Sequence, residues 1–320
     1  MLCGEKLSFS PPSKFWHSSC NIFEVWYNIK EVSDVSKNAI GRLCAVISVL
    51  CLLLCLVGCR RSEAATGLSV EVLDVGQSDC TLLRQGDAVW MIDAATTTER
   101  GSVIGALYDR RIERIDCLVL THPHEDHIGN ARMLLENYEV GTLIVSPCST
   151  DDLTYRLVLE TAEQQGVSCH VASAEEIYTL GGAVVEILLA DASAAEPNDA
   201  SVVLRVTYGN TAFLFTGDAE LDGETALLAT AAAEKLDCDF LKAGHHGSDT
   251  SCCEALLQAV TPTHVAISCG KNNEYGFPHQ ALLQRLDAIG ATYHRTDEQG
   301  TLRYVSDGEE IHFLNENALH

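Results

Sequence analysis

The sequence predicts an α/β fold in which two β-sheets pack face to face and helices cover their outer sides. Short apolar runs with strand-like alternation are interleaved with helix-like stretches, which is typical of layered α/β architectures. These runs fall into two blocks, each with its own helices. In addition, a chain of 320 residues with 47% hydrophobic residues can bury a full core without disulfides or a structural metal.

The first block begins at residue 68 with three strand-like runs separated by turn residues such as Gly76, Gly86 and Asp87. Amphipathic and apolar runs then alternate, which predicts helices between strands. The elements expected in this block are strands 68–75, 80–84, 88–93, 116–121, 143–146 and 167–172, with helices 103–112 and 151–165.

The second block starts with three strand-like runs, of which the last two are joined at Gly209-Asn210, a hairpin dipeptide. Helix-like and strand-like runs alternate from there to the C-terminus. The elements expected here are strands 183–190, 201–208, 211–217, 238–242 and 263–268, helices 222–235, 252–259 and 279–289, and terminal strands.

An apolar leader precedes these blocks. Leu43 to Val57 carry no charge, and this run is shorter than the roughly 20 residues that a membrane-spanning helix needs, so it suits the core of a signal peptide. The tetrapeptide ending at Cys59 (Leu-Val-Gly-Cys) resembles the bacterial lipobox, whose cysteine is lipidated. We expect a leader (1–58), a tether (59–67) and one domain (68–320), lipid-anchored on the extracellular face of the cytoplasmic membrane. An uncleaved anchor helix is the alternative.

Charge and cysteine placement exclude several classes of protein. A formal net charge of −24 counts against a broad basic face, so we expect no stable binding of duplex DNA. Of the 14 cysteines, eight follow Cys59, and no CxxC pair occurs. Neither a zinc ribbon nor a thioredoxin-like redox site is therefore indicated.

Three histidines and an aspartate lie within six residues directly after strand 116–121. They are His122, His124, Asp126 and His127, and Pro123 favours a sharp turn between them. Imidazole binds zinc, iron or manganese, and a carboxylate adds neutralising charge. The HxHxDH spacing after an apolar strand favours a metal site over a set of surface-loop histidines.

Two further segments place polar side chains after predicted strands. Asp218 follows strand 211–217, where its carboxylate serves either as a metal ligand or as a cap of helix 222–235. His245 and His246 follow strand 238–242 between two glycines, which let the backbone approach a ligand closely. We expect one of these histidines to bind metal and the other to face the substrate, and the sequence leaves open which.

These motifs together resemble the metallo-β-lactamase superfamily, in its branch related to the extracellular hydrolase domain of the competence protein ComEC. Residues 74–79 match the branch's DVGQGD with Ser78 in place of glycine, and residues 120–130 match LTHPHxDHIGG with Asn130 in place of the second glycine. Residues 272–279 resemble NxYGHPH, with Phe277 where histidine is usual. The resemblance extends from about residue 68 to the C-terminus.

The resemblance implies a four-layer αββα sandwich that binds two divalent metal ions, zinc or manganese. It implies that His122 and His124 hold one ion, that Asp126 and His127 hold the other, and that Asp218 bridges them. Asn198 and Asp199 stand where many members of the superfamily have another histidine, so a ligand there is left open.

The implied function is that of a binuclear phosphodiesterase or nuclease using a metal-bound hydroxide, acting on DNA or a smaller phosphate ester. Its expected catalytic residues are Asp126, His245, His246 and Lys242, where Lys242 is either a donor to phosphate or a surface lysine. Two alternatives are a non-catalytic metal-binding module of a DNA-uptake or envelope complex, and a lactam or lactone hydrolase.

Overall fold

The structure is a computed structural model that describes residues 67–314. The predicted leader, Cys59 and tether residues 60–66 lie outside the described residues. The chain divides into two units, Met1–Arg61 and Ser62–His320, and the described residues all belong to the second. Between residues 67 and 314, no helix has both the length and the apolar character required to cross a membrane.

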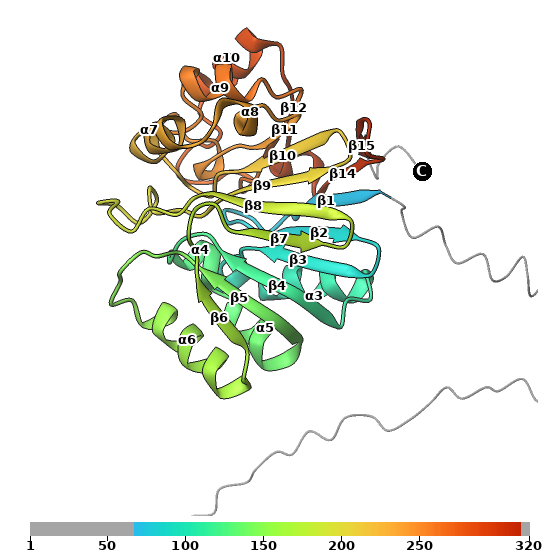
Figure 1. Cartoon of the computed structure of the whole chain (residues 1–320), viewed down its shortest axis with the longest axis vertical. Helices are drawn as coiled ribbons and strands as arrows, with labels where there is room; N and C mark the ends of the chain where they lie inside the picture. The colour runs from blue at the N-terminus through green and yellow to red at the C-terminus, as the bar shows by residue number, and fades with distance from the viewer. Residues whose placement is uncertain (1–66, 315–320) are drawn as a thin grey trace, which may run out of the picture. The chain divides into compact units, whose positions relative to one another are not determined.

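Two β-sheets form the centre of this unit (Figure 1). The eight-stranded sheet has the order β15 (Ile311–Leu314), β14 (Leu302–Ser306), β1 (Leu68–Val72), β2 (Thr81–Gln85), β3 (Ala88–Ile92), β4 (Arg114–Leu120), β5 (Glu139–Val145) and β6 (Ser168–Val171). The seven-stranded sheet has the order β13 (Thr292–Arg295), β12 (His264–Ile267), β11 (Phe240–Lys242), β10 (Thr211–Phe215), β9 (Val203–Tyr208), β8 (Ala183–Leu189) and β7 (Ile177–Leu180).

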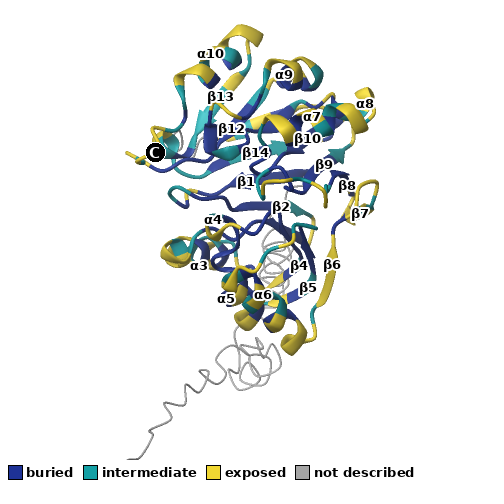
Figure 2. Cartoon of the chain, turned by 90° about the vertical axis from the view of Figure 1, so that its left-hand side faces the viewer, coloured by how far each residue is buried: buried dark blue, intermediate teal, exposed yellow. Residues whose placement is uncertain are grey.

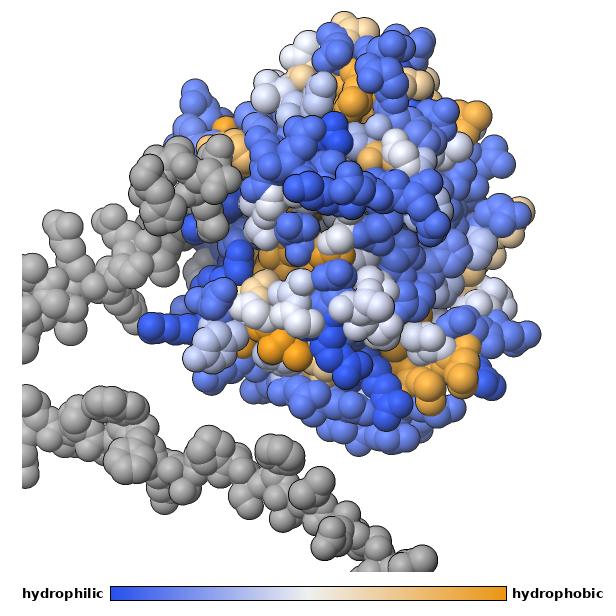
Figure 3. Space-filling view, turned by 180° about the vertical axis from the view of Figure 1, so that it is seen from behind, coloured by the Kyte–Doolittle hydropathy of each residue, from blue (hydrophilic) through white to orange (hydrophobic). Residues whose placement is uncertain are grey.

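Helices occupy the outer sides of both sheets, and their outward faces are the exposed ones in Figure 2. The first part of the chain contributes η2 (Thr97–Glu99), α3 (Arg100–Asp109), α4 (Glu125–Ile128), α5 (Ala131–Asn137) and α6 (Leu153–Gln165). The second part contributes α7 (Leu221–Thr230), α8 (Ala233–Leu236), η3 (His245–Gly247), α9 (Glu254–Val260), α10 (Gln280–Ile289) and α11 (Thr296–Gln299). The face in Figure 3 is mainly hydrophilic, with small separate hydrophobic areas.

Three hydrophobic cores separate the four layers. One lies between the eight-stranded sheet and its helices, a second between the sheets, and a third between the seven-stranded sheet and its helices. Strand β10 shows how the sequence specifies this arrangement, because successive side chains of a strand point to opposite faces. Phe213 and Phe215 enter the core between the sheets, whereas Ala212 and Leu214 enter the core beneath the helices. The predicted αββα sandwich is confirmed.

Local boundaries differ from the expectation in three places. The expected helix 222–235 is two helices, because Ala231 and Ala232 adopt extended backbone angles between α7 and α8. The terminal strands β14 and β15 return to the first sheet, where β14 pairs antiparallel with β1. Strand β7 and helices α4 and α5 were not among the expected elements. The hairpin at Gly209-Asn210 is confirmed by antiparallel pairing of β9 and β10.

Parallel pairing brings the polar ends of several strands to one edge of each sheet. Strand β3 runs parallel to β4, while β10, β11 and β12 run parallel to one another. The carboxyl ends of parallel strands meet at one edge, where open α/β sheets bind ligands. A hydrogen bond from Val202 N to Thr121 O (2.9 Å) links the two sheets there. Segments that are far apart in the sequence therefore converge at this edge.

Candidate metal centre

The HxHxDH segment forms a fixed loop between β4 and α4. Thr97 N and Thr97 Oγ1 donate to Glu125 Oε1 at 2.8 and 2.7 Å, which ties the start of α4 to η2. A Cβ on Gly129 would lie 2.6 Å from Thr97 N and 2.7 Å from Ala95 O, so only glycine allows this close approach. His122 and His127 are buried in this loop, whereas His124 is exposed.

Four of the predicted site residues converge on one point: Asp126, His127, Asp218 and His246. Their donor atoms all lie within 4.8 Å of one another, and we call this set the quartet. His127 Nε2 lies 3.2 Å from Asp218 Oδ2 and 3.9 Å from Asp126 Oδ2. His246 Nε2 lies 3.1 Å from Asp126 Oδ2 and 3.6 Å from Asp218 Oδ2. Two imidazoles and two carboxylates in this geometry suit a divalent cation.

His122 and His124 form a second pair of donors beside the quartet. His122 Nε2 and His124 Nδ1 lie 3.0 Å apart, and the ring of His122 lies 4.1 Å from the ring of His127, centroid to centroid. The two nitrogens are thus within hydrogen-bond distance of each other, and the His122 ring packs against the quartet.

Asp93, at the end of β3, was missing from the predicted site. Its carboxylate accepts hydrogen bonds from His127 Nδ1 (2.8 Å), Thr121 N (2.8 Å) and Thr121 Oγ1 (2.8 Å). This contact orients the ring so that His127 Nε2 points into the quartet, as outer carboxylates do for metal-binding histidines. The available signal was the one used for Asp218, an aspartate directly after an apolar strand.

His246 is held in a comparable way by groups from three other segments. Its Nδ1 donates to Ser268 O at 3.1 Å and lies 3.4 Å from Asp79 Oδ1. Lys242 Nζ forms an ion pair with Asp79 and donates to Ala243 O at 2.9 Å. Asp79 N also donates to Asp126 O at 3.1 Å, so Asp79 supports two members of the quartet. Lys242 is only 4% exposed, so its ammonium is occupied beneath the site and is not a surface group.

The two adjacent histidines have different surroundings. Both have left-handed backbone angles, with φ of 46° for His245 and 52° for His246, and such strain in non-glycine residues is common at functional sites. His246 is buried within the quartet, while the His245 side chain is 25% exposed and its Nδ1 lies 3.2 Å from Glu220 Oε1. The geometry thus places His246 within the quartet and His245 partly in contact with solvent.

Burial and neighbouring charges shift the pKa values of the buried histidines in opposite directions. Burial and the nearby His127 lower the pKa of His122 well below its usual value, which favours the neutral, metal-binding form. Burial opposes protonation of His127, yet Asp218 and Asp93 outweigh it and raise that pKa well above its usual value. Burial is likewise outweighed at His246, where Asp218 and Asp79 raise the pKa to about 10.

The quartet fits a divalent cation because some of its buried polar atoms lack hydrogen-bond partners. Among the described residues, His127 Nε2 and Asp218 Oδ1 are buried without a hydrogen-bond partner. His127 and His246 compensate the two carboxylates only by carrying protons, and a bound cation would replace those protons. A buried, partly unsatisfied set of this kind is costly unless a ligand completes it.

Asn198 and Asp199 contact the start of α7. Asp199 Oδ1 accepts hydrogen bonds from Glu220 N (3.0 Å) and Gly223 N (2.8 Å), at the start of α7. Asn198 Nδ2 donates to Glu220 Oε1 at 2.8 Å. Through Oδ1, Asp199 therefore caps the start of a helix.

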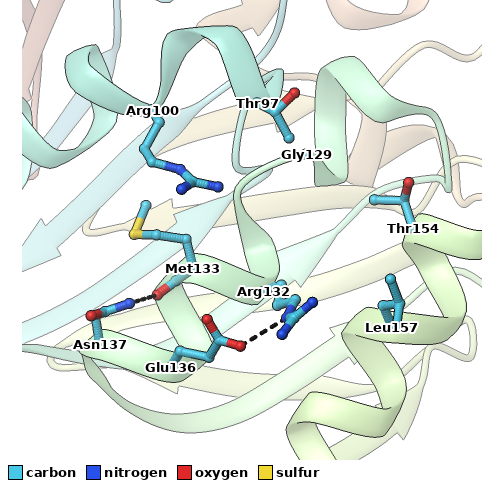
Figure 4. A pocket seen from close by; sticks show the side chains of 9 residues that line it. All are labelled: Thr97, Arg100, Gly129, Arg132, Met133, Glu136, Asn137, Thr154 and Leu157. Carbon is cyan, nitrogen blue, oxygen red and sulfur yellow. Dashed lines mark hydrogen bonds and ion pairs between the residues drawn. The ribbon is translucent and has the colours of Figure 1, made fainter. Parts of the chain in front are cut away.

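A separate surface pocket of about 410 Å³ lies between η2, α3, α5 and α6 (Figure 4). Arg100 extends into it, and Arg132 pairs with Glu136 at 2.8 Å along its wall. None of the quartet residues lines this pocket, and Gly129 is its link to the HxHxDH loop. The metal centre and the pocket are therefore distinct features.

Comparison with known proteins identifies the family of this chain. The sequence profile of the metallo-beta-lactamase superfamily matches residues 73–271. ComE operon protein 3 of Bacillus subtilis (strain 168) is 29% identical over 293 residues, which cover 84% of this chain and 37% of that protein. Recombination protein 2 of Haemophilus influenzae is 29% identical over 251 residues, which cover 76% and 29%. The chain spans about a third of the length of the curated relatives it matches.

Solved structures show the same fold. The metallo-beta-lactamase fold protein YhfI from Bacillus subtilis superimposes with a TM-score of 0.52 at 12% identity, covering 74% of this chain and 99% of YhfI. CmlA, a diiron beta-hydroxylase from Streptomyces venezuelae, gives a TM-score of 0.50 at 14% identity, covering 75% and 54%. These similarities concern the fold alone.

Proposed function

Because the chain belongs to the metallo-β-lactamase superfamily, in its ComEC-like branch, we propose that it is a metal-dependent hydrolase of phosphodiesters. The observation that carries the proposal is the convergence of the buried quartet within 4.8 Å. A purely structural set of buried charges would leave Asp218 Oδ1 without a hydrogen-bond partner and His127 Nε2 with only an ionic contact to Asp218 Oδ2, at considerable free-energy cost.

The quartet, Asp218 included, would hold one divalent ion, and His122 and His124 would supply donors for a second. The mixed nitrogen and oxygen donors suit zinc or manganese. When bound, such ions supply Lewis acidity and an activated nucleophile at neutral pH.

Three residues around the ligands take different roles in this proposal. His245, next to ligand His246 and partly exposed, donates a proton to the leaving oxygen, and Glu220 orients its ring. Lys242 acts indirectly, because its ammonium neutralises Asp79 beneath His246. This differs from a direct contact of Lys242 with phosphate, since the side chain is buried.

The substrate proposed is a phosphodiester, either DNA or a smaller phosphate ester. A nucleic acid substrate is supported by the relatives' names, which are ComE operon protein 3, Recombination protein 2 and Competence protein ComA. The net charge of −24 disfavours tight binding of duplex DNA, so cations in the site must contribute to substrate affinity.

The test combines metal analysis of the full chain with hydrolysis of bis(p-nitrophenyl) phosphate. We expect metal-dependent hydrolysis by the wild type, loss of activity in Asp126→Ala, and unchanged activity in the surface control Asp151→Ala. Bound metal without any hydrolysis would instead support a non-catalytic metal-binding module. Hydrolysis of nitrocefin or a lactone without phosphodiester hydrolysis would instead support a lactam or lactone hydrolase.

We also propose that the protein is exported and anchored through a lipid on Cys59, on the extracellular face of the cytoplasmic membrane. The support is the uncharged run Leu43–Val57 followed by the lipobox-like tetrapeptide. Cys59→Ala is expected to block processing or release the protein from membranes. Unchanged processing and membrane association would overturn this proposal.

A further inference from the structure

An exposed aromatic ring lies on the segment that packs against the metal centre. Tyr275 is 58% exposed, and its ring stacks on Phe277 with a centroid distance of 5.4 Å and an interplanar angle of 19°. Because Phe277 covers one side of the ring, the other side is available to solvent.

The row of rings continues from Tyr275 to the metal ligands. Phe277 lies 5.7 Å from His245, centroid to centroid, in an edge-to-face arrangement. His245 in turn lies 6.3 Å from His246, a member of the quartet. A flat molecule resting on Tyr275 would therefore sit at the outer end of a continuous aromatic row that begins at the reacting centre.

Hydrogen bonds fix the backbone of the segment that carries Tyr275 and Phe277, so the two rings are held in place before any ligand binds. Asn273 Oδ1 accepts from Phe277 N at 2.9 Å, and Asn273 Nδ2 donates to Phe277 O at 2.7 Å. His279 N donates to Gly247 O at 2.9 Å, which fastens the segment to the turn that carries His246. Preorganised aromatic surfaces bind with a small entropic penalty.

We propose that Tyr275 and Phe277 form a stacking shelf for an unpaired base of a single-stranded nucleic acid whose phosphodiester lies at the metal centre. This inference rests on the proposed function and names its substrate class. A protein with a net charge of −24 gains little from a basic surface, whereas base stacking contributes affinity whatever the base sequence. Exposed Lys271, at the start of the same segment, adds a cation for the strand. Bases inside a duplex are not accessible to such a ring, which favours single strands.

The experiment compares two labelled 12-nucleotide strands by fluorescence anisotropy with the metal-loaded full chain. Both carry phosphorothioate linkages to slow cleavage; one has normal bases, and the other has abasic residues at every position. We expect the wild type to bind the base-carrying strand about 5-fold more tightly or better. Tyr275→Ala should remove this preference without changing the affinity for the abasic strand, and Tyr275→Phe should retain it.

Tyr108 provides the matched control, because it is 80% exposed on α3. Tyr108→Ala should leave the preference for bases unchanged. Equal wild-type affinity for the two strands, no binding of either strand, or an unchanged preference in Tyr275→Ala would each overturn the shelf. Should Tyr275→Ala fail to fold, the comparison of the two strands with the wild-type protein tests the shelf.

Hydrolysis of bis(p-nitrophenyl) phosphate separates the two proposals. Activity without base preference refutes the shelf alone, and base preference without activity refutes the phosphodiesterase alone.

Discussion

The two halves of the metal centre differ in how completely the protein builds them. On one side, the quartet supplies two imidazoles and two carboxylates, and both of its histidines are oriented by further groups. On the other side, only His122 and His124 face each other, and His124 is exposed. Asp199, which the sequence left open as a further ligand, accepts two hydrogen bonds through Oδ1 at the start of α7.

This difference shows that two sets of metal-binding side chains are not equivalent when only one set is oriented by further hydrogen bonds. Outer hydrogen bonds fix the tautomer and orientation of ligating histidines and raise metal affinity. The quartet has such support from Asp93 and Asp79, so we expect it to bind an ion more tightly than the His122–His124 side. Three substitutions test this asymmetry, and a fourth tests the turn that carries His246.

Asp218→Asn should have the largest effect, because this carboxylate belongs to the quartet and also acts electrostatically on His122. We expect both ions to bind far more weakly and hydrolysis to fall to the level of the buffer, since the quartet loses a charged oxygen donor. Metal content after dialysis and phosphodiester turnover measure the result. His122→Ala, as a contrast, should remove one ion and leave the quartet ion bound.

Asp79→Asn should weaken binding of the quartet ion by about 10- to 100-fold, because His246 loses the carboxylate beside its Nδ1. Competition with a fluorescent chelator gives the affinity. Glu71→Gln is the matched control, since it breaks another largely buried ion pair, with Arg110, away from the centre. An equal loss of metal affinity in both variants would show that Asp79 acts only through stability.

The sequence predicted the residues of the centre that lie in one short segment. It did not predict contacts made by residues that lie far apart in the chain. His122, His124, Asp126 and His127 share one short loop after a strand, so their convergence follows from the pattern alone. The choice of His246 over His245 depends on two left-handed residues in one turn, which no periodicity reveals. Lys242 was expected to be either a phosphate donor or a surface lysine, and its buried pairing with Asp79 could not be foreseen because the two residues lie 163 positions apart. The return of β14 to β1 is equally non-local.

Gly247→Ala should destabilise the turn that carries His246. Gly247 has φ of 88°, and an added Cβ would lie 2.7 Å from Pro278 Cβ, so we expect a loss of about 2–3 kcal/mol in the free energy of unfolding. Denaturant unfolding checks this value. Gly276→Ala is the control, because its φ of 72° is comparable but no atom lies within 4 Å of the added Cβ. Similar losses in both variants would mean that the approach of Pro278 is unimportant.

Asp199→Ala should have the smallest effect and bears directly on the weaker side. Loss of its hydrogen bonds to Glu220 N and Gly223 N should cost about 1 kcal/mol of stability, as for other helix caps. Metal stoichiometry should stay unchanged. The loss of one ion would instead identify Asp199 as a ligand and remove the asymmetry between the two sides.

The most direct measurement is a titration of the metal-depleted full chain with Mn²⁺, in which ion binding and hydrolysis of bis(p-nitrophenyl) phosphate are followed together. We predict a tight first ion at the quartet, a weaker second ion, and hydrolysis that appears as the centre fills and is absent in Asp218→Asn. Equal affinity for both ions would contradict the asymmetry. Hydrolysis that is unchanged without metal, or unchanged in Asp218→Asn, would contradict the assignment of the quartet as the reacting centre.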